Sequence, residues 1–356
     1  MIITTTGYYN TGSSAITHIL KEFDDSNLVD DVNEIRLLYD PDGIDDLRYH
    51  LIDCPHRQNT SFAVKRFIKF IKYNSNVFSN HHYEKISNRS FKKMSYKYIQ
   101  SICDFSYPSI SHIECYEKGV LFTFLNRIYQ KFYCFFKYRL HITFPKDSLV
   151  SRKTKQFAGT FDKQHFLFCT QQYVMGFLNC CNKNNGNYLV IDQLFPPTNI
   201  SRYREYLPEK ESVVVFIVDR DPRDLYCICK YFGKTSAIPC KKVQDFCEWF
   251  KWTRNQSTLS NDPDYVVRIQ FEDLIYKYEK SRDIIAKKCN LDLQKCSKKG
   301  VFFDPSKSIN NTQVWKKYPQ AANDIAYIEK ELSNYCYDFS KYSKGPSDDI
   351  NQMFEC

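Results

Sequence analysis

Apolar runs that alternate with helix-like segments predict the architecture at the start of this chain. The β-branched and apolar residues of Met1–Thr6 predict a buried first strand. After a glycine and serine turn at residues 12–14, apolar positions recur at helical spacing from Ala15 to Phe23. A second short strand is expected over Val32–Leu38. A strand, a helix and a second strand within this interval predict a parallel β-sheet.

Three apolar runs in the second half of the chain predict further strands. They cover Tyr188–Ile191, Val213–Val218 and Tyr265–Ile269, and the last leads into a helix expected from Phe271 to Lys288. Uniformly apolar runs are typical of central parallel strands, because both faces of such strands are covered. The expected fold class is therefore α/β, a P-loop-like parallel β-sheet flanked by helices.

The stretch between these two halves has a different pattern. From Gly43 to Asn185 the sequence is mostly helical, polar and aromatic, with few strand signals. We therefore expect a large helical insertion, residues 43–185, within a single domain of residues 1–356. A chain of 356 residues with 43% hydrophobic residues can bury a substantial core without disulfides or metals.

Composition narrows the classes of function. The 15 cysteines are scattered and show no zinc-finger spacing, so we expect reduced thiols and no metal site. Residues 1–7 lack the pattern of a signal peptide, and a cytoplasmic location is the simplest expectation. The net charge of +9 suits anionic ligands, but the cations form no dense arm, so nucleic acid is not expected as a partner.

Part of the positive charge is concentrated in residues 125–155. This stretch holds eight cations and one anion, with aromatic residues interleaved among the cations. Its pattern favours an amphipathic helix whose aromatic side chains lie in the core and whose basic face is solvated. The alternative is a platform for an anionic glycan or a peripheral contact with a membrane surface. The longest apolar run, Val120–Phe136, is interrupted by polar residues and is not expected to span a membrane.

The turn between the first strand and the first helix has the features of a phosphate site. Its sequence is Gly-Tyr-Tyr-Asn-Thr-Gly-Ser-Ser, residues 7–14. Free backbone N–H groups and the helix dipole favour an anion at such a position. The spacing is that of a P-loop, but Ser13 stands where a nucleoside-triphosphate P-loop has lysine. The turn therefore favours phosphate binding and argues against a kinase or an ATPase.

A second candidate phosphate contact follows the strongest predicted strand. Arg220 lies at the carboxyl edge of that strand, and a helix is expected to begin at Pro222. An arginine at this edge is well placed for a bidentate phosphate contact. The alternative is that Arg220 and Arg223 form surface ion pairs with the neighbouring Asp221 and Asp224.

Together these motifs resemble the sulfotransferase family, whose donor is PAPS (3′-phosphoadenosine 5′-phosphosulfate). The Thr-Gly-Ser-Ser turn resembles the family's 5′-phosphosulfate loop, and Val-Asp-Arg-Asp-Pro-Arg-Asp at 218–224 resembles its 3′-phosphate motif. Three further segments resemble the family in the expected order, namely the aromatic helix at 246–252, Phe-Glu-Asp-Leu at 271–274 and the segment 303–315. The resemblance covers residues 1–40 and 188–318 and leaves out the insertion.

The resemblance implies roles for individual residues. The 5′ end of PAPS would contact four residues of the turn, Thr11, Gly12, Ser13 and Ser14. Arg220 would hold the 3′-phosphate, and Ser308 and Asn311 would contact the nucleotide from the carboxyl-terminal loop. The product would be PAP (3′-phosphoadenosine 5′-phosphate), and no metal would be required.

Two positions depart from the family's pattern. Asn10 replaces the lysine or arginine that often precedes the Thr-Gly pair, and Ile228 replaces a serine eight residues after the motif arginine. Asn10 can still donate a hydrogen bond. The full positive charge is expected from Arg36 or from a lysine of the insertion.

Glu34 is the expected general base. A carboxylate beside the phosphate turn can accept the proton of an attacking hydroxyl, and the Asn-Glu pair at 33–34 resembles the glycan-modifying branch of the family. The alternatives are an ion pair between Glu34 and Arg36, or a histidine base at His18, His50 or His56.

The resemblance suggests a carbohydrate or glycolipid acceptor, such as a bacterial capsule or lipopolysaccharide precursor, with the insertion shaping the acceptor site. Two other functions remain open. One is a P-loop nucleotide or nucleoside kinase. The other is a non-catalytic glycan- or membrane-binding protein on a degenerate sulfotransferase fold.

Overall fold

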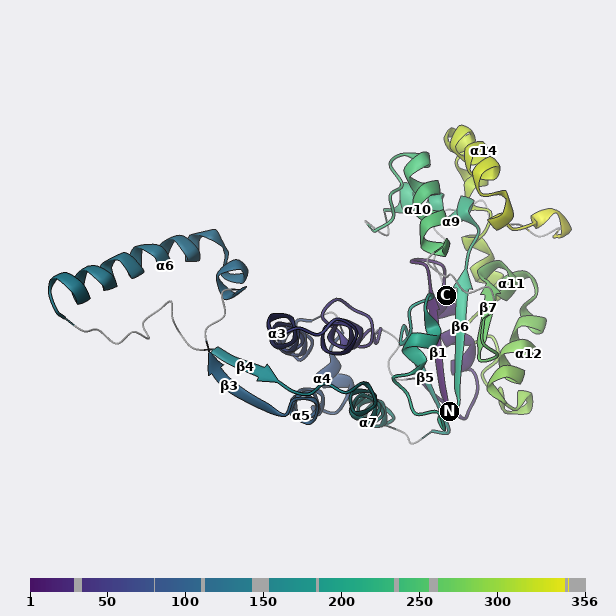
Figure 1. Cartoon of the computed structure of the whole chain (residues 1–356). Helices are drawn as coiled ribbons and strands as arrows, with labels where there is room; N and C mark the ends of the chain where they lie inside the picture. The colour runs from purple at the N-terminus through teal and green to yellow at the C-terminus, as the bar shows by residue number, and fades with distance from the viewer. Residues whose placement is uncertain are drawn as a thin grey trace.

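A computed structural model describes most of the 356-residue chain (Figure 1). The described residues are 1–28, 34–79, 81–109, 113–142, 154–183, 186–233, 237–255, 262–342 and 345. Val32 and Asn33 of the expected second strand lie outside them.

The centre of the fold is a five-stranded parallel sheet in the order β2-β5-β1-β6-β7. Its strands are β1 (Ile2–Gly7), β2 (Ser26–Leu28), β5 (Tyr188–Asp192), β6 (Val213–Asp219) and β7 (Val266–Gln270). The expected α/β class and four of the expected strands are confirmed. β1 lies at the centre, between β5 and β6, so the loops that follow these three strands meet at one edge of the sheet.

The expected strand over Val32–Leu38 is wrong. The second strand ends earlier, at Leu28, and residues 34–40 form loop and turn. Ile35 and Leu37 are fully buried, but they pack into the core between the sheet and the insertion rather than joining the sheet. A buried loop and a buried strand can share the same apolar pattern, which explains the error.

Alternating side chains of the central strands supply two separate cores. On β6, Val213, Val215 and Ile217 face the helices of the insertion, whereas Val214, Phe216 and Val218 face the other way. That second face is covered by α1 (Ser13–Lys21), α11 (Phe271–Tyr276) and α12 (Tyr278–Cys289). Both faces are therefore buried, as a parallel sheet requires.

A third core lies beyond the carboxyl ends of the strands. It joins α9 (Pro222–Phe232), α10 (Val243–Asn255) and α14 (Ala322–Glu331). The helix expected to begin at Pro222 is confirmed, and the carboxylate of Asp221 caps it by accepting the N–H of Arg223 at 2.8 Å. Shorter helical segments complete this part of the chain, at Ile200–Arg204 (α8), Leu293–Lys295, Pro305–Ser308 (α13), Ile309–Asn311, Val314–Lys317, Pro319–Ala321, Ser333–Tyr335 and Phe339–Lys341.

The insertion is mostly helical, as expected. It contains α2 (Ile44–Arg48), a π-helix (Tyr49–Asp53), α3 (Arg57–Asn74), α4 (Tyr83–Ile86), α5 (Phe91–Ile102), α6 (Ile113–Arg139) and α7 (Lys163–Cys181). It also contains an antiparallel ladder that was not expected, formed by β3 (Phe105–Ser109) and β4 (Thr154–Ala158). α3, α5 and α7 contribute to the core that the insertion shares with one face of the sheet. α6 lies beyond the ladder, away from the sheet (Figure 1).

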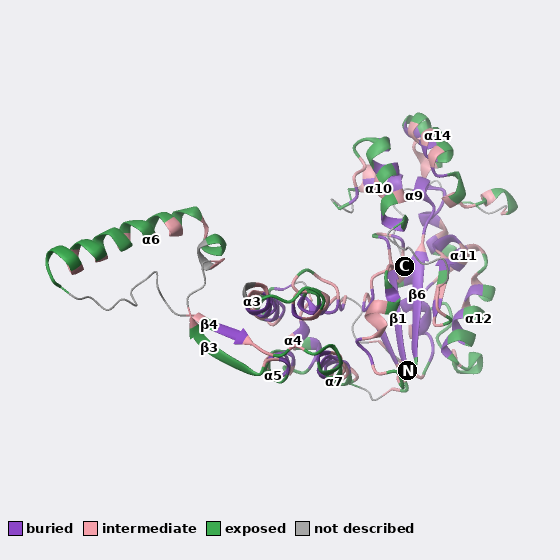
Figure 2. Ribbon diagram, in the orientation of Figure 1, coloured by how far each residue is buried: buried purple, intermediate pink, exposed green. Residues whose placement is uncertain are grey.

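The expectation that the aromatic side chains of residues 125–155 lie in the core is wrong for the described part, residues 125–142 and 154–155. α6 is exposed along its length (Figure 2), and Phe132, Phe135 and Tyr138 are among its exposed side chains. An aromatic pattern favours burial but does not specify a packing partner. Among the described residues, no helix is both long and apolar enough to cross a membrane.

Candidate functional site

A cavity of about 670 Å³ opens at the carboxyl edge of the sheet. It is lined by the turn at residues 7–14, by Glu34, Arg36 and Tyr39, and by parts of residues 192–198. Arg220 after β6, Ile228 on α9, and Trp252 and Thr253 on α10 complete the lining. Open parallel sheets bind their ligands at this edge, and a cavity of this volume suits a nucleotide-sized molecule.

The turn after β1 adopts a conformation that few sequences allow. Tyr9, Asn10 and Gly12 have positive φ values of 61°, 52° and 89°. Thr11 stabilises the turn because its hydroxyl oxygen accepts the N–H of Tyr8 at 3.1 Å. The turn therefore wraps back toward the start of α1.

Gly12 is required by space as well as by φ. A Cβ atom at this position would lie 2.5 Å from the ring of Phe271, which packs beneath the turn. Gly12 is also the N-cap residue of α1 and provides no side-chain cap. The first N–H groups of α1 are thus left without the usual side-chain acceptor, and Ser13 and Ser14 add hydroxyl groups at the cavity wall. Such a helix start favours an anion.

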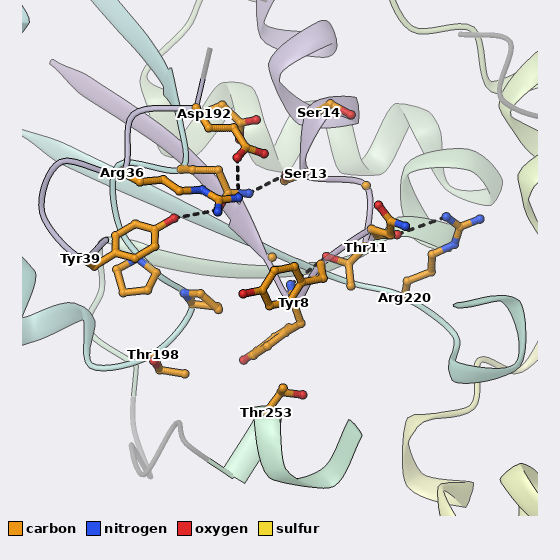
Figure 3. A pocket seen from close by; sticks show the side chains of 18 of the residues that line it. Tyr8, Thr11, Ser13, Ser14, Arg36, Tyr39, Asp192, Thr198, Arg220 and Thr253 are labelled. Atoms are coloured by element: carbon orange, nitrogen blue, oxygen red, sulfur yellow. Dashed lines mark hydrogen bonds and ion pairs between the residues drawn. The ribbon is translucent and has the colours of Figure 1, made fainter. Parts of the chain in front are cut away.

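Arg220 lies at the same cavity, beside this turn (Figure 3). Its side chain is buried and donates to two backbone carbonyls, those of Asn10 at 3.4 Å and of Asn311. The guanidinium also stacks over Phe271 at 4.6 Å. Within the described residues Arg220 makes no ion pair, and its buried Nε has no hydrogen-bond partner. A buried guanidinium with a spare donor is a strong candidate for an anionic ligand.

The alternative of local ion pairs holds for one arginine and fails for the other. Arg223 pairs with Asp221 at 2.6 Å, as that alternative expected, although this pair is buried rather than on the surface, and Arg223 also pairs with Glu329 at 2.8 Å. Arg220 does not pair with Asp221 or Asp224 in the described structure. The two arginines of the motif therefore differ, with Arg223 stabilising the fold and Arg220 facing the cavity.

Buried carboxylates hold the surroundings of Arg220 in place. Asp224 accepts the N–H groups of Gln313 at 3.0 Å and Val314 at 2.5 Å, and burial raises its pKa to about 8. Glu272 accepts the N–H of Asp221 at 2.9 Å, and burial raises its pKa as well. The bonds of Asp224 join the carboxyl-terminal loop to the start of α9, which places the carbonyl of Asn311 against Arg220, and the bond of Glu272 joins α11 to the same helix start.

Ser308 and Asn311 are close to this position but do not line the cavity. Both are buried, and Asn311 reaches Arg220 through its backbone carbonyl. The structure therefore brings Arg220 and Asn311 together, and it places Thr11, Gly12, Ser13 and Ser14 in the same cavity as Arg220. Asn10 also lines the cavity, and its backbone carbonyl accepts from Arg220.

Glu34 and Arg36 line the opposite part of the cavity. The two side chains form an ion pair, with Glu34 40% and Arg36 27% exposed. The Arg36 backbone N–H donates to the hydroxyl of Tyr83 at 2.9 Å, so the insertion supports this loop. Glu34 thus shares a cavity with Ser13 and Ser14, as expected of the base, but it is also paired with Arg36, as the alternative expected.

The cavity holds a second carboxylate, Asp192, which no sequence motif indicated. Asp192 ends β5, next to β1, and accepts the hydroxyl of Thr5 at 2.8 Å. Burial raises its pKa to about 6, although Arg36 and two hydroxyl groups favour the charged form. The neighbouring Gln193 accepts from Tyr39 at 3.1 Å. In the sequence, Asp192 is an aspartate at the end of an apolar strand. Its place in the cavity follows only from the pairing of β5 with β1.

Aromatic side chains border the cavity on the side of α10, where Tyr8 and Trp252 line it. Behind them, Arg254 stacks on Tyr8 at 4.3 Å and on the buried Phe250 at 3.5 Å, and it pairs with Asp219. Trp252 is exposed at the rim, next to Thr253. Ile228, which replaces the family's serine, also reaches the cavity. This side of the cavity offers an apolar surface to a flat ring, such as a nucleobase.

Several expected contributors are not at the cavity. Among the described residues that line it there is no histidine, so His18, His50 and His56 lie elsewhere. No described residue of 43–185 lines it either. In the described part of the chain, no group of three or more His, Cys, Asp or Glu side chains is arranged to hold a metal ion.

Comparison with models of known protein families and with curated proteins gives no match to this chain. The cavity combines a helix start without a side-chain cap, two arginines and two carboxylates, a set that can bind a phosphorylated molecule and accept a proton beside it.

Proposed function

We propose that this chain is a sulfotransferase that moves a sulfuryl group from PAPS to a hydroxyl or amine of a carbohydrate. The observation that carries the proposal is Arg220, a buried cavity arginine without an ion pair among the described residues, beside the Gly12 turn. Two separate positions for negative charge in one cavity match a nucleotide that carries a phosphate on its ribose and a charged group at its 5′ end.

The residues present fit such a donor. Thr11, Gly12, Ser13 and Ser14 would hold its 5′ end through backbone N–H groups and hydroxyls, and Arg220 would hold the 3′-phosphate. Ser308 and Asn311 would support the nucleotide from the carboxyl-terminal loop. When bound, PAPS supplies an activated sulfuryl group, and its transfer to an acceptor leaves PAP.

The other cavity residues supply charge and a proton acceptor. Arg36 would provide the positive charge that a lysine or arginine at position 10 would otherwise give, while Asn10 would donate a hydrogen bond. Glu34 would accept the proton of the acceptor hydroxyl, and its pairing with Arg36 would keep the carboxylate oriented toward the cavity. Asp192, held by Thr5, is a second carboxylate in reach of the same space.

The acceptor we propose is a carbohydrate or glycolipid, such as a precursor of a bacterial surface glycan, and we propose that the enzyme acts in the cytoplasm. This choice rests on the resemblance of the Asn-Glu pair at 33–34 to the glycan-modifying branch of the family.

Turnover of PAPS tests the proposal. Purified protein incubated with PAPS, EDTA and an extract of surface glycan precursors should release PAP and add sulfate to a glycan, which mass spectrometry detects. Arg220→Ala should abolish this release, whereas Lys85→Ala, at an exposed lysine of the insertion that does not line the cavity, should not change it. Absence of PAP release, or an activity that requires ATP and magnesium, would exclude the sulfotransferase and favour the kinase.

A further inference from the structure

α6 is the part of the described structure with the most exposed apolar surface. Leu121 is 72% and Phe132 59% exposed, and Phe124, Leu125, Ile128 and Phe135 are exposed as well. Figure 2 shows the helix as almost entirely exposed, beyond the ladder of β3 and β4. Contiguous exposed apolar surface marks a site of interaction with a protein or a membrane.

Six of the exposed apolar residues lie on one face of α6. The helix is interrupted at Gly119, and from Val120 onward a rotation of about 100° per residue places the side chains around the axis. Six exposed residues then fall within an arc of about 100°, and we call this set the α6 apolar face: Leu121, Phe124, Leu125, Ile128, Phe132 and Phe135.

The rest of α6 is polar and basic. Asn126, Gln130 and Lys137 lie opposite the apolar face, whereas Arg127 and Lys131 lie along one of its borders and Arg139, at the end of the helix, falls in line with it. From Val120 to Arg139 the sequence contains no aspartate or glutamate. Lys137 lies over the ring of Tyr138 at 5.2 Å, so even this cation is close to an aromatic side chain.

We propose that the α6 apolar face binds the surface of a lipid bilayer that contains anionic lipids. An apolar face rich in phenylalanine and leucine, beside a polar face rich in lysine and arginine, is the composition of helices that lie in the plane of a membrane interface. α6 is not apolar enough to cross the membrane. The apolar face would enter the boundary of the acyl chains, and the three cations would interact with the head groups.

The charges favour a membrane over the other occupants. In a dimer formed through α6, the cations of two copies would approach each other with no acidic side chain on either helix segment to neutralise them. An anionic membrane neutralises all of them. This inference goes beyond the proposed function, because it uses none of the cavity residues and would hold for a different reaction.

Co-sedimentation with vesicles tests the inference. The full chain should bind vesicles of phosphatidylcholine and phosphatidylglycerol, bind pure phosphatidylcholine much more weakly, and lose binding as salt is added. Changing Arg127, Lys131 and Lys137 together to glutamine should weaken binding to the anionic vesicles about 100-fold, since each cation contributes roughly fivefold near such a surface.

A second variant tests how much the α6 apolar face contributes to vesicle binding, separately from the contribution of charge. Leu121→Ser, Phe132→Ser and Phe135→Ser in one chain should abolish binding to vesicles. These residues are exposed, so the variant should keep the thermal unfolding midpoint of the parent. Phe78→Ser is the matched control, because Phe78 is 90% exposed but lies outside α6, and it should leave binding unchanged.

Three results would overturn the inference. The first is a full chain that fails to bind the anionic vesicles. The second is a serine variant that binds like the parent. The third is a parent that is dimeric in sedimentation analysis and becomes monomeric in the serine variant, which would assign the face to a second copy. Binding of PAP, measured separately, is expected to be unchanged in the serine variant, so failure here is distinguishable from failure of the proposed function.

Discussion

The buried carboxylate of Asp192 makes the stability of this protein depend on pH in a predictable direction. Burial raises the pKa of Asp192 from 3.8 to about 6, so the folded protein binds this proton more strongly than the unfolded chain does. For a carboxyl group with a raised pKa, stability is highest when the group is protonated and falls as pH rises between the two values. Asp192→Asn removes this ionisation and keeps an acceptor for the hydroxyl of Thr5.

The magnitude follows from the size of the shift. The difference between 3.8 and about 6 is roughly two units, and each unit corresponds to about 1.36 kcal/mol. Because the side chain borders the cavity and remains partly solvated, we expect about 2 to 3 kcal/mol rather than more. The unfolding free energy of Asp192→Asn, relative to the parent, should therefore rise by this amount between about pH 4 and pH 7.5.

Urea unfolding of both proteins at several pH values measures this difference, because titration of all other groups cancels between them. Asp283→Asn, at a side chain that is 56% exposed, is the matched control for the loss of a carboxylate. A difference for Asp192→Asn that stays constant from pH 4 to pH 7.5 would refute the reasoning that burial controls this carboxylate.

Three further predictions concern the cavity. Glu34→Gln should lower PAPS turnover by about 10² to 10⁴-fold and leave PAP affinity nearly unchanged. His18→Gln, the control, should keep most of the activity. A Glu34→Gln protein that is still active would eliminate Glu34 as the base. Arg220→Ala should weaken PAP binding by about 2 to 4 kcal/mol in calorimetry, and an unchanged affinity would remove Arg220 from the nucleotide site. Gly12→Ala should destabilise the protein by about 2 to 5 kcal/mol, because it adds a clash to an unfavourable φ. Gly233→Ala, also at positive φ but in open space, should cost only about 1 to 2 kcal/mol in the same unfolding assay, and equal losses would contradict the role of the clash.

The sheet could be predicted because its signals are local. Tyr188–Asp192, Val213–Asp219 and Val266–Gln270 are short, mainly apolar runs, the first two followed by polar turns and the third directly by a helix, and such runs form parallel strands. The helix at Pro222 was equally clear, because proline and the preceding Asp221 mark a helix start. Where the position of a segment depends on tertiary packing, the sequence pattern led to a wrong prediction.

Two errors illustrate this limit. Ile35 and Leu37 have the apolar character of a strand but fill the core from a loop, because space between the sheet and the insertion was available to them. The aromatic residues of α6 were expected in a core, yet the helix extends away from the helices that could have covered it. Neither outcome is encoded by the local pattern alone.

Only the site residues that belong to sequence motifs could be predicted. The Gly12 turn and Arg220 follow adjacent parallel strands, and β1 pairs with β6, so they meet at one edge of the sheet. Asp192 belongs to no motif, and its place in the cavity depends on the pairing of β5 with β1. Trp252 and Tyr39 were also missed, since their contribution comes from helix and loop placement.

Calorimetry with PAP and AMP tests the central claim most directly. In EDTA, the protein should bind PAP about 30 to 1,000-fold more tightly than AMP, which corresponds to a 3′-phosphate contact of roughly 2 to 4 kcal/mol at Arg220. This preference should disappear in Arg220→Ala. Equal affinities for PAP and AMP, or binding that requires magnesium, would contradict the assignment of this cavity to a PAPS donor.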